Sequence, residues 1–289
     1  MRRFAIAALA ALLAAGGAVA QSANASPLGR WSIAPARGDD QSRVQLSLEY
    51  SDSGNGRSWN SSWSSPIALS DAGIPADRLR GPVGPVTFRI QREPGAFDCT
   101  GSAGEGSGAG QFRYEPSTKF DDALASRGLV RPSFEQSLEL AISGTTLAFV
   151  DQLRASSQHA TTADVVRVVQ HGVNPKYIAD LTALGYRTTS LDELVRLRDH
   201  GVSAGFIRAI QSAGYRDLSA NDLVRLADHG VGEKYIAEMR AAGYKNLGTG
   251  DLIALRDHGV SAAFVDRLKA HGYSNLPVRD LIRLRDSGI

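Results

Sequence analysis

The segment from Ser190 to Leu218 reads SLDELVRLRDHGVSAGFIRAIQSAGYRDL, and close variants of it follow one another from residue 161 to residue 289. The tripeptide His-Gly-Val marks each copy and recurs with a step of 29 residues, at His171, His200, His229 and His258. A fixed period of this length is typical of stacked supersecondary units. The repeat therefore predicts that residues 161–289 form an α-solenoid of four and a half units.

Each copy encodes two helices that end at glycines. Ser190 has the side chain of a helix N-cap, and Glu193, three residues later, would complete a capping box. Gly201 would end the first helix by adopting the left-handed conformation. A second helix is expected from about Ser203 to Gly214. One such hairpin cannot bury both of its faces, so neighbouring copies must stack.

The apolar positions change in identity but keep their size and place, as a shared core requires. One slot holds an aromatic residue in every copy: Tyr177, Phe206, Tyr235 and Phe264. The segment 132–160 is predicted to be a degenerate first repeat, because Phe149–Ala155 aligns with Phe264–Ala270. An atypical end unit is expected where a solenoid must cover its first face. Residues 117–131 are interpreted as a connecting segment.

The first 20 residues have the features of an export signal. Arg2 and Arg3 precede an apolar run, and Ala18-Val19-Ala20 resembles a cleavage site. We therefore expect an exported protein, periplasmic or secreted, with a flexible leader at 21–28 and no transmembrane segment after cleavage. Of 32 basic and 30 acidic residues, the signal contains only Arg2 and Arg3, so the mature chain carries no net charge. This balance argues against a nucleic-acid partner.

Residues 29–116 change to a twofold period, as in Val44, Leu46 and Leu48. We predict an antiparallel β domain of five or six strands, which leaves sandwich and barrel open. The overall fold class is then α+β, with two domains. The glycine run from Gly101 to Gly110 is interpreted as a long hairpin loop. A dinucleotide-binding loop is disfavoured there, because a strand-like segment follows where a helix is needed.

Two tryptophans, Trp59 and Trp63, are four residues apart and share one face of a predicted strand. Such a pair could form a stacking platform for a sugar or peptide, although core packing is the more common use. The only cysteine, Cys99, has the parity of Phe97 and is expected to be a buried, inert thiol.

Histidines recur in Asp-His pairs, for example Asp199-His200 and Asp228-His229. Equivalent positions on stacked helices are roughly 8–10 Å apart, too far for two histidines to share one metal ion. We expect each histidine to cap the C-terminus of its own helix. No metal or cofactor is predicted.

Arginines on the first helices are the other candidate interaction residues. They form two sets: Arg196, Arg225 and Arg283, and Arg198, Arg256 and Arg285. Each arginine of the first set has an aspartate three residues later, which favours a solvated face of intrahelical pairs. A binding ridge for an acidic partner is the alternative.

The motif Asp251-Leu252-Ile253-x-Leu255-Arg256-Asp257-His258-Gly259-Val260 resembles tandem hairpins in an exported bacterial family that joins a small β domain to such repeats. Similar repeats are appended to membrane metallopeptidases of the β-lactam-sensor type. The β domain adds the related pattern Val86-x-Phe88-x-Ile90. The peptidase motif is absent here, so the resemblance implies an envelope interaction or sensing module and transfers no catalytic residue.

The sequence thus favours a non-enzymatic exported scaffold that binds a protein partner in the cell envelope through its helical repeats. A cell-wall or carbohydrate-binding module that uses Trp59 and Trp63 is the alternative, with a glycan as partner. An enzyme with a site between the two domains is the least favoured hypothesis.

Overall fold

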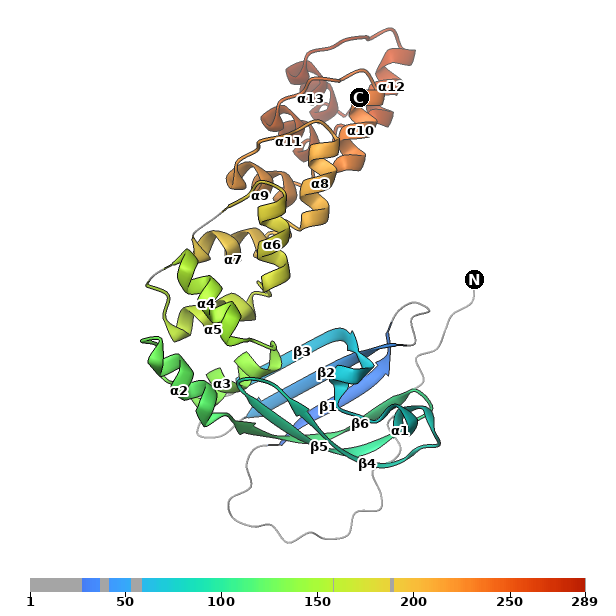
Figure 1. Ribbon diagram of the computed structural model, residues 1–289. Helices are drawn as coiled ribbons and strands as arrows, with labels where there is room; N and C mark the ends of the chain where they lie inside the picture. The colour runs from blue at the N-terminus through green and yellow to red at the C-terminus, as the bar shows by residue number, and fades with distance from the viewer. Residues whose placement is uncertain (1–27, 37–41, 53–58, 158, 188–189, 289) are drawn as a thin grey trace. The chain divides into compact units, whose positions relative to one another are not determined.

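The computed structural model describes residues 28–36, 42–52, 59–157, 159–187 and 190–288 (Figure 1). The predicted signal (1–20) and nearly all of the predicted leader (21–28) lie outside these ranges. The described chain forms two compact units. The first extends to Arg89 and includes Phe97–Tyr114, and the second comprises Ile90–Ala96 and everything from Glu115. The predicted combination of a β part and a series of helices is confirmed.

The first unit is one antiparallel sheet of six strands in the order β3-β2-β1-β6-β5-β4. The strands are β1 (Leu28–Pro35), β2 (Arg43–Asp52), β3 (Trp59–Ala68), β4 (Gly84–Gln91), β5 (Gly95–Gly104) and β6 (Ser107–Pro116). A short 3-10 helix, η1 (Leu69–Ala72), and α1 (Ala76–Arg80) connect β3 to β4. Alternate side chains point into the core, as the twofold period predicts.

The indole of Trp31 organises the core of this sheet. Its ring meets Phe88 of β4 edge to face, with centroids 4.9 Å apart. Its Nε1 donates to the Thr100 carbonyl oxygen at 3.1 Å. Because β6 and β5 separate β1 from β4 in the strand order, the sheet must curl for this contact to form. Glycines leave room for the ring: a Cβ on Gly110 would lie 2.7 Å from Trp31 Nε1.

This packing explains why the prediction of a long glycine-rich loop was wrong. The glycines at 101, 104, 108 and 110 lie within β5 and β6, and only Glu105 and Gly106 form the turn. Both turn residues have positive φ, 52° and 84°, as the favoured two-residue hairpin turn requires. These four strand glycines are needed because the Trp31 ring and neighbouring backbone lie too close to these positions for a side chain. The local sequence does not reveal either contact.

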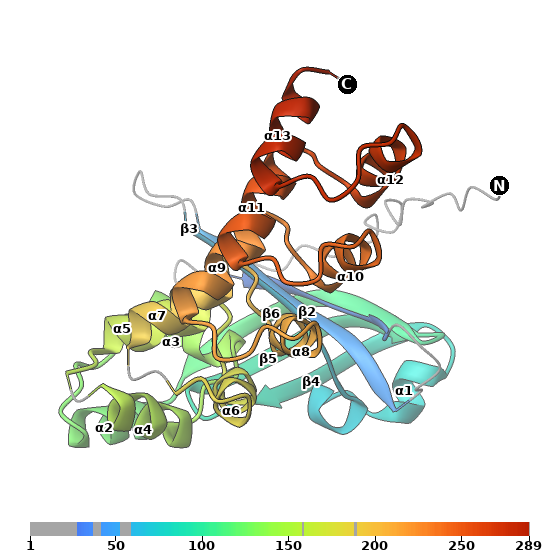
Figure 2. The same ribbon diagram turned by 90° about the horizontal axis from the view of Figure 1, so that it is seen from above.

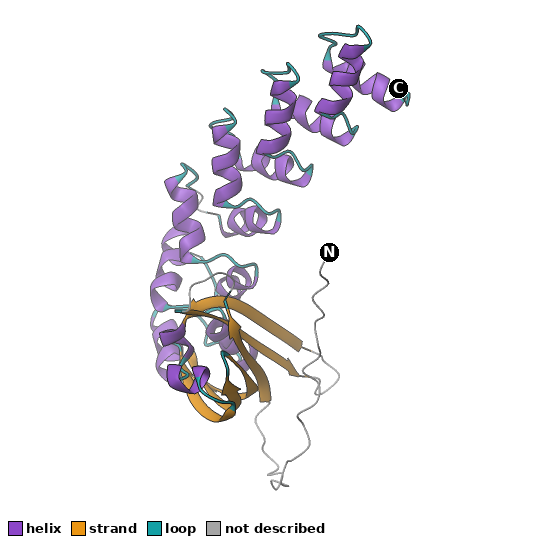
Figure 3. Cartoon of the chain, turned by 90° about the vertical axis from the view of Figure 1, so that its right-hand side faces the viewer, coloured by secondary structure: helices purple, strands orange, loops and turns teal. Residues whose placement is uncertain are grey.

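The second unit is a stack of helical hairpins. The first helices are α3 (Phe134–Ile142), α5 (Thr162–Gln170), α7 (Leu191–Asp199), α9 (Ala220–Asp228), α11 (Thr249–Asp257) and α13 (Val278–Asp286). Their partners are α4 (Leu147–Ser156), α6 (Pro175–Ala183), α8 (Ala204–Ser212), α10 (Glu233–Ala241) and α12 (Ala262–Ala270). From α5 and α6 onward, each helix packs on its equivalent in the next repeat, so the stack has two rows (Figures 2 and 3).

The stack begins with α2 (Thr118–Ser126), which lies in the predicted connecting segment and packs on α4. The turn at Ile90–Ala96 also belongs to this unit. Glu93 Oε2 accepts a hydrogen bond from the Leu147 backbone N–H at 2.7 Å, so its carboxylate caps the start of α4.

The predicted glycine stops are confirmed, and the predicted caps are confirmed in part: Thr161 and Asp164 form a capping box, whereas, among the described residues, Ser190 caps α7 with its side chain without such a box. Ser190 Oγ accepts from the Glu193 N–H at the start of α7. After α7, Gly201 adopts φ 71°, and the Val202 N–H bonds back to the Leu197 carbonyl at 2.9 Å. This is a Schellman turn, and Val202 is fully buried as its hydrophobic contact. The same turn follows the first helix of the other three complete copies, and the buried valines of these turns belong to one continuous apolar core, which includes residues from Phe120 to Leu281.

Candidate functional site

Four histidine–aspartate pairs join successive repeats, and we call them the His–Asp ladder. In each, Nδ1 of the histidine that follows a first helix lies 2.6–2.9 Å from Oδ1 of an aspartate in the next repeat. The pairs are His171–Asp199, His200–Asp228, His229–Asp257 and His258–Asp286. The predicted C-cap position of these histidines is confirmed, but their side chains bond to the neighbouring repeat and not to their own helix.

The second arginine set, which we call the stacked arginines, also joins repeats. The guanidinium carbons of Arg198, Arg256 and Arg285 lie 5.0–5.6 Å from the centroids of aromatic rings in the preceding repeat. The rings are those of Tyr177, Tyr235 and Phe264. A cation this close to a ring face is attracted by the ring quadrupole. These three arginines therefore help to hold the stack together.

The first set, the outer arginines Arg196, Arg225 and Arg283, is exposed. Arg196 donates to Asn221 Oδ1 in the next repeat at 2.8 Å. Arg225 lies 4.0 Å from Asp222 of its own helix. The expected pairing with the aspartate three residues later is wrong, because the ladder histidines bond to those aspartates. The arginines of both sets are exposed, and the stacked arginines are in addition held against aromatic rings.

Trp63 lies on the core side of the sheet. It is half-buried on β3 opposite Leu48, which is itself opposite Trp31 on β1. Directly opposite residues of an antiparallel pair project on the same face, and Leu48 and Trp31 are buried. The side chain of Trp59 lies outside the described part of the structure. Trp63 therefore contributes to the apolar face of the sheet, and part of its side chain stays exposed at the β3 edge.

Cys99 is fully buried, as its parity predicts. Burial, and after it the charge of Asp98, raise the pKa of the thiol to about 12. Such a thiol is protonated at neutral pH and is a poor nucleophile.

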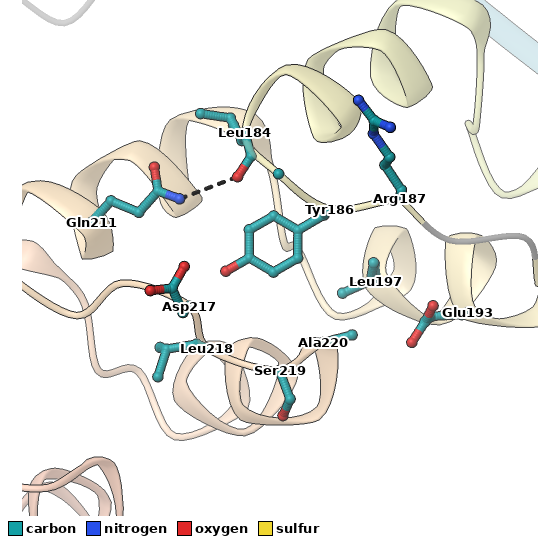
Figure 4. Close-up of a pocket in the computed structure, with 11 residues that line it drawn as sticks. Leu184, Tyr186, Arg187, Glu193, Leu197, Gln211, Asp217, Leu218, Ser219 and Ala220 are labelled. Carbon is teal, nitrogen blue, oxygen red and sulfur yellow. Dashed lines mark hydrogen bonds between the residues drawn. The ribbon is translucent and has the colours of Figure 1, made fainter.

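A cavity of about 360 Å³ lies between the first two complete repeats, and we call it the Tyr186 pocket (Figure 4). Its lining includes Gly185 and Tyr186 before α7, Glu193 on α7, Gln211 on α8 and Asp217 after α8. Gln211 Nε2 donates to the Leu184 carbonyl oxygen at 3.3 Å. Burial, and after it the negative charge of Asp217, raise the pKa of the Tyr186 phenol.

Sequence reasoning missed the Tyr186 pocket, although the signal for it is present in the repeats. Position 211 is glutamine where the next two copies have Arg240 and Lys269, and position 217 is aspartate where they have Asn246 and Asn275. Aligning the copies for their differences, as well as their identities, would have marked this junction.

Across residues 28–36, 42–52, 59–157, 159–187 and 190–288, no group of three or more His, Cys, Asp or Glu side chains is placed to hold a metal ion. In the same ranges no helix has both the length and the apolar character to cross a membrane. Comparison with protein-family models, with curated proteins and with solved structures finds no match to this chain.

Proposed function

We propose that the protein is a non-enzymatic exported scaffold that binds a protein partner in the cell envelope through the surface of its helical repeats. Envelope sensing or signalling is the role that the sequence resemblance suggests for such binding. The observation that carries the proposal is a contrast between the contacts that join the repeats and the side chains that the repeats expose.

Two features of the contacts between repeats recur in every complete copy. The His–Asp ladder repeats four times, and the aromatic slot is filled at each copy. Uniform contacts of this kind serve the stack, since each repeat is stabilised only by its neighbours.

The exposed positions of the second helices differ from copy to copy. One exposed position reads Ala179, Arg208, Ala237 and Asp266, on α6, α8, α10 and α12. Another reads Lys176, Gly205, Lys234 and Ala263. Exposure to water does not require a particular side chain at these positions. A partner that spans several repeats would contact a different side chain in each repeat. Extended surfaces of stacked repeats commonly bind proteins in this way.

A variant that has the same residue at one exposed position of all four second helices tests the proposal. Arg208→Ala and Asp266→Ala together make this position alanine in all four copies, and alanine already occupies it in α6 and α10. The fold should therefore be retained. We expect the wild-type mature protein to retain one specific protein from an envelope extract, and the double variant to retain much less of it. Arg30→Ala, at an exposed position of β1, is the control and should bind normally. Equal retention by wild type and double variant would contradict the proposal.

The alternative of a carbohydrate-binding module is less favoured, because the side chain of Trp63 is on the core side of its sheet. A direct check is retention of the mature wild type on insoluble polysaccharide.

A further inference from the structure

The Tyr186 pocket occupies the place that an arginine fills one repeat later. At the following junction, Arg240 extends over the ring of Tyr215, with its guanidinium carbon 5.9 Å from the ring centroid. Its Nη2 lies 2.9 Å from the point where a Cβ on Gly214 would stand. At the junction after that, Lys269 brings its Nζ to 3.8 Å from the same point on Gly243. Two successive junctions thus hold a cation beside the glycine that precedes the tyrosine.

The first junction has the same glycine and tyrosine but not the cation. The residue at the position of Arg240 is Gln211, whose neutral amide is bonded to the Leu184 carbonyl. Apart from Gly185 and its two chain neighbours, no atom of the described residues lies within 4 Å of the point where a Cβ on Gly185 would stand. Among the described residues, therefore, no side chain takes the place beside Gly185 that a guanidinium takes beside Gly214.

The later junctions also have a tyrosine hydrogen bond that the first junction lacks among the described residues. Tyr215 and Tyr244 donate their hydroxyls to the carbonyl oxygens of Leu247 and Leu276, at 2.7 and 2.8 Å. Each of these bonds ties a tyrosine to the end of the next repeat. The equivalent acceptor for Tyr186 is Leu218, which lines the pocket without such a bond to Tyr186 among the described residues.

The charge of the pocket suits a cation. Asp217 stands where the later copies have neutral asparagine, and Glu193 adds a second carboxylate to the lining. In Figure 4, Asp217 lies on the hydroxyl side of the Tyr186 ring, while the guanidinium of Arg187 points away from it. An arginine entering here would meet a ring face and a carboxylate together, the two groups that bind a guanidinium best.

We propose that the Tyr186 pocket binds an arginine side chain of the protein partner, whose guanidinium takes the place that Arg240 takes against Tyr215. This inference rests on the proposed function, because it names the chemistry of the partner at one point of the repeat surface.

The first test uses the purified mature protein and a small probe. N-acetyl-arginine methylamide is titrated while the backbone amide signals of Gly185 and Leu218 are followed by NMR. We expect saturable shifts with a dissociation constant on the order of 1–10 mM, as for a small ligand with few contacts. The citrulline analogue has the same shape without the charge and should bind about tenfold more weakly. Equal binding of the two probes, or no saturable shift, would overturn the proposal.

Two variants locate the site. Gln211→Arg should fill the pocket with the chain's own guanidinium, as Arg240 does, and abolish the probe-induced shifts. Asp217→Asn should weaken arginine binding about tenfold by removing one carboxylate. Asparagine is compatible with the backbone there, since Asn275 has φ 57° at the equivalent position and Asp217 has φ 58°. Undiminished arginine binding in folded Asp217→Asn or Gln211→Arg protein would assign the probe to another site and overturn the proposal.

Capture of the envelope partner then separates the two proposals. If arginine binds and Gln211→Arg abolishes both probe binding and partner capture, the inference is supported. Capture that survives Gln211→Arg unchanged would leave the scaffold function standing and overturn the pocket as its contact. Probe binding without capture of any protein by the wild type would instead refute the scaffold function and, with it, the assignment of the pocket to a protein partner.

Discussion

His200 Nδ1 lies 2.6 Å from Asp228 Oδ1, although the two residues belong to successive repeats. Both side chains are about 40% exposed, at 40% and 41%. Exposed pairs of this kind contribute little, because water screens them and two side chains must be ordered. Any contribution of the ladder to stability therefore comes from four weak bonds together, one at each junction.

A double-mutant cycle measures one rung of the ladder. We expect His200→Ala and Asp228→Ala to show a coupling free energy of unfolding of about 0.2–1 kcal/mol, within the range of exposed pairs. Urea unfolding followed by circular dichroism at 222 nm gives the four stabilities. Strict additivity of the two single effects would mean that the bond adds nothing to the stack.

Tyr177→Phe tests a buried bond between repeats. The Tyr177 hydroxyl donates to the Val202 carbonyl at 2.8 Å, and the next copy has Phe206 in the same slot. Packing should survive, while the carbonyl loses its donor. The expected loss in the free energy of unfolding is about 0.5–1.5 kcal/mol at pH 7. An unchanged urea midpoint would show that the carbonyl is satisfied in another way.

Alkaline titration provides a separate check on the same slot. Burial raises the pKa of Tyr177 and of Tyr235 to about 12. The unfolded state ionises near the ordinary pKa of about 10, so the stabilisation is complete below that pH and is lost as the pH rises toward 12. Absorbance at 295 nm should show late-ionising phenols, and their number should fall by about two in the Tyr177→Phe/Tyr235→Phe variant. Ionisation of every tyrosine near pH 10 in the folded protein would contradict this.

Gly110→Ala tests the space that Trp31 needs. An added Cβ would lie 2.0 Å from the Thr100 carbonyl oxygen and 2.7 Å from Trp31 Nε1. Overpacking typically costs about 1–3 kcal/mol, and we expect a loss at the upper end of that range. Tryptophan fluorescence reports this unit alone, because all three tryptophans precede Arg89.

Gly250→Ala is the matched control for that substitution. The residue is in α11, and apart from its two chain neighbours and the backbone of that helix no described atom lies within 4 Å of its added Cβ. Alanine in a helix should raise the stability of the helical unit by roughly 0.5–1 kcal/mol. Destabilisation by both substitutions would show that the effect at Gly110 is not specific to Trp31.

The helical hairpins could be predicted from the sequence because their determinants are local. Ser190, Gly201 and Gly214 mark the ends of helices through backbone chemistry that repeats in each copy. The glycines of β5 and β6 could not be interpreted in this way. Gly101, Gly108 and Gly110 leave room for Trp31, about 70 residues earlier, and Gly104 leaves room for the backbone of Val83.

The partners of the side chains that join repeats could not be predicted from the sequence either. Asp199 and His200 are adjacent in sequence, but Asp199 bonds to His171 and His200 bonds to Asp228. Only the geometry of the stack decides between an intrahelical and an inter-repeat partner. The Tyr186 pocket depends on the same geometry, together with a departure from the repeat at Gln211.

Site-specific photo-crosslinking tests most directly whether the repeat surface binds a protein partner. A photoreactive residue replaces the exposed Ala237 on α10 in one variant and the exposed Arg30 on β1 in another, so that Arg208 and Asp266 are kept, and each variant is irradiated in intact envelope. We expect one discrete adduct from position 237 that excess unlabelled mature protein suppresses, with no equivalent adduct from position 30. The same adducts from both positions, or none from position 237, would contradict binding through the repeat surface.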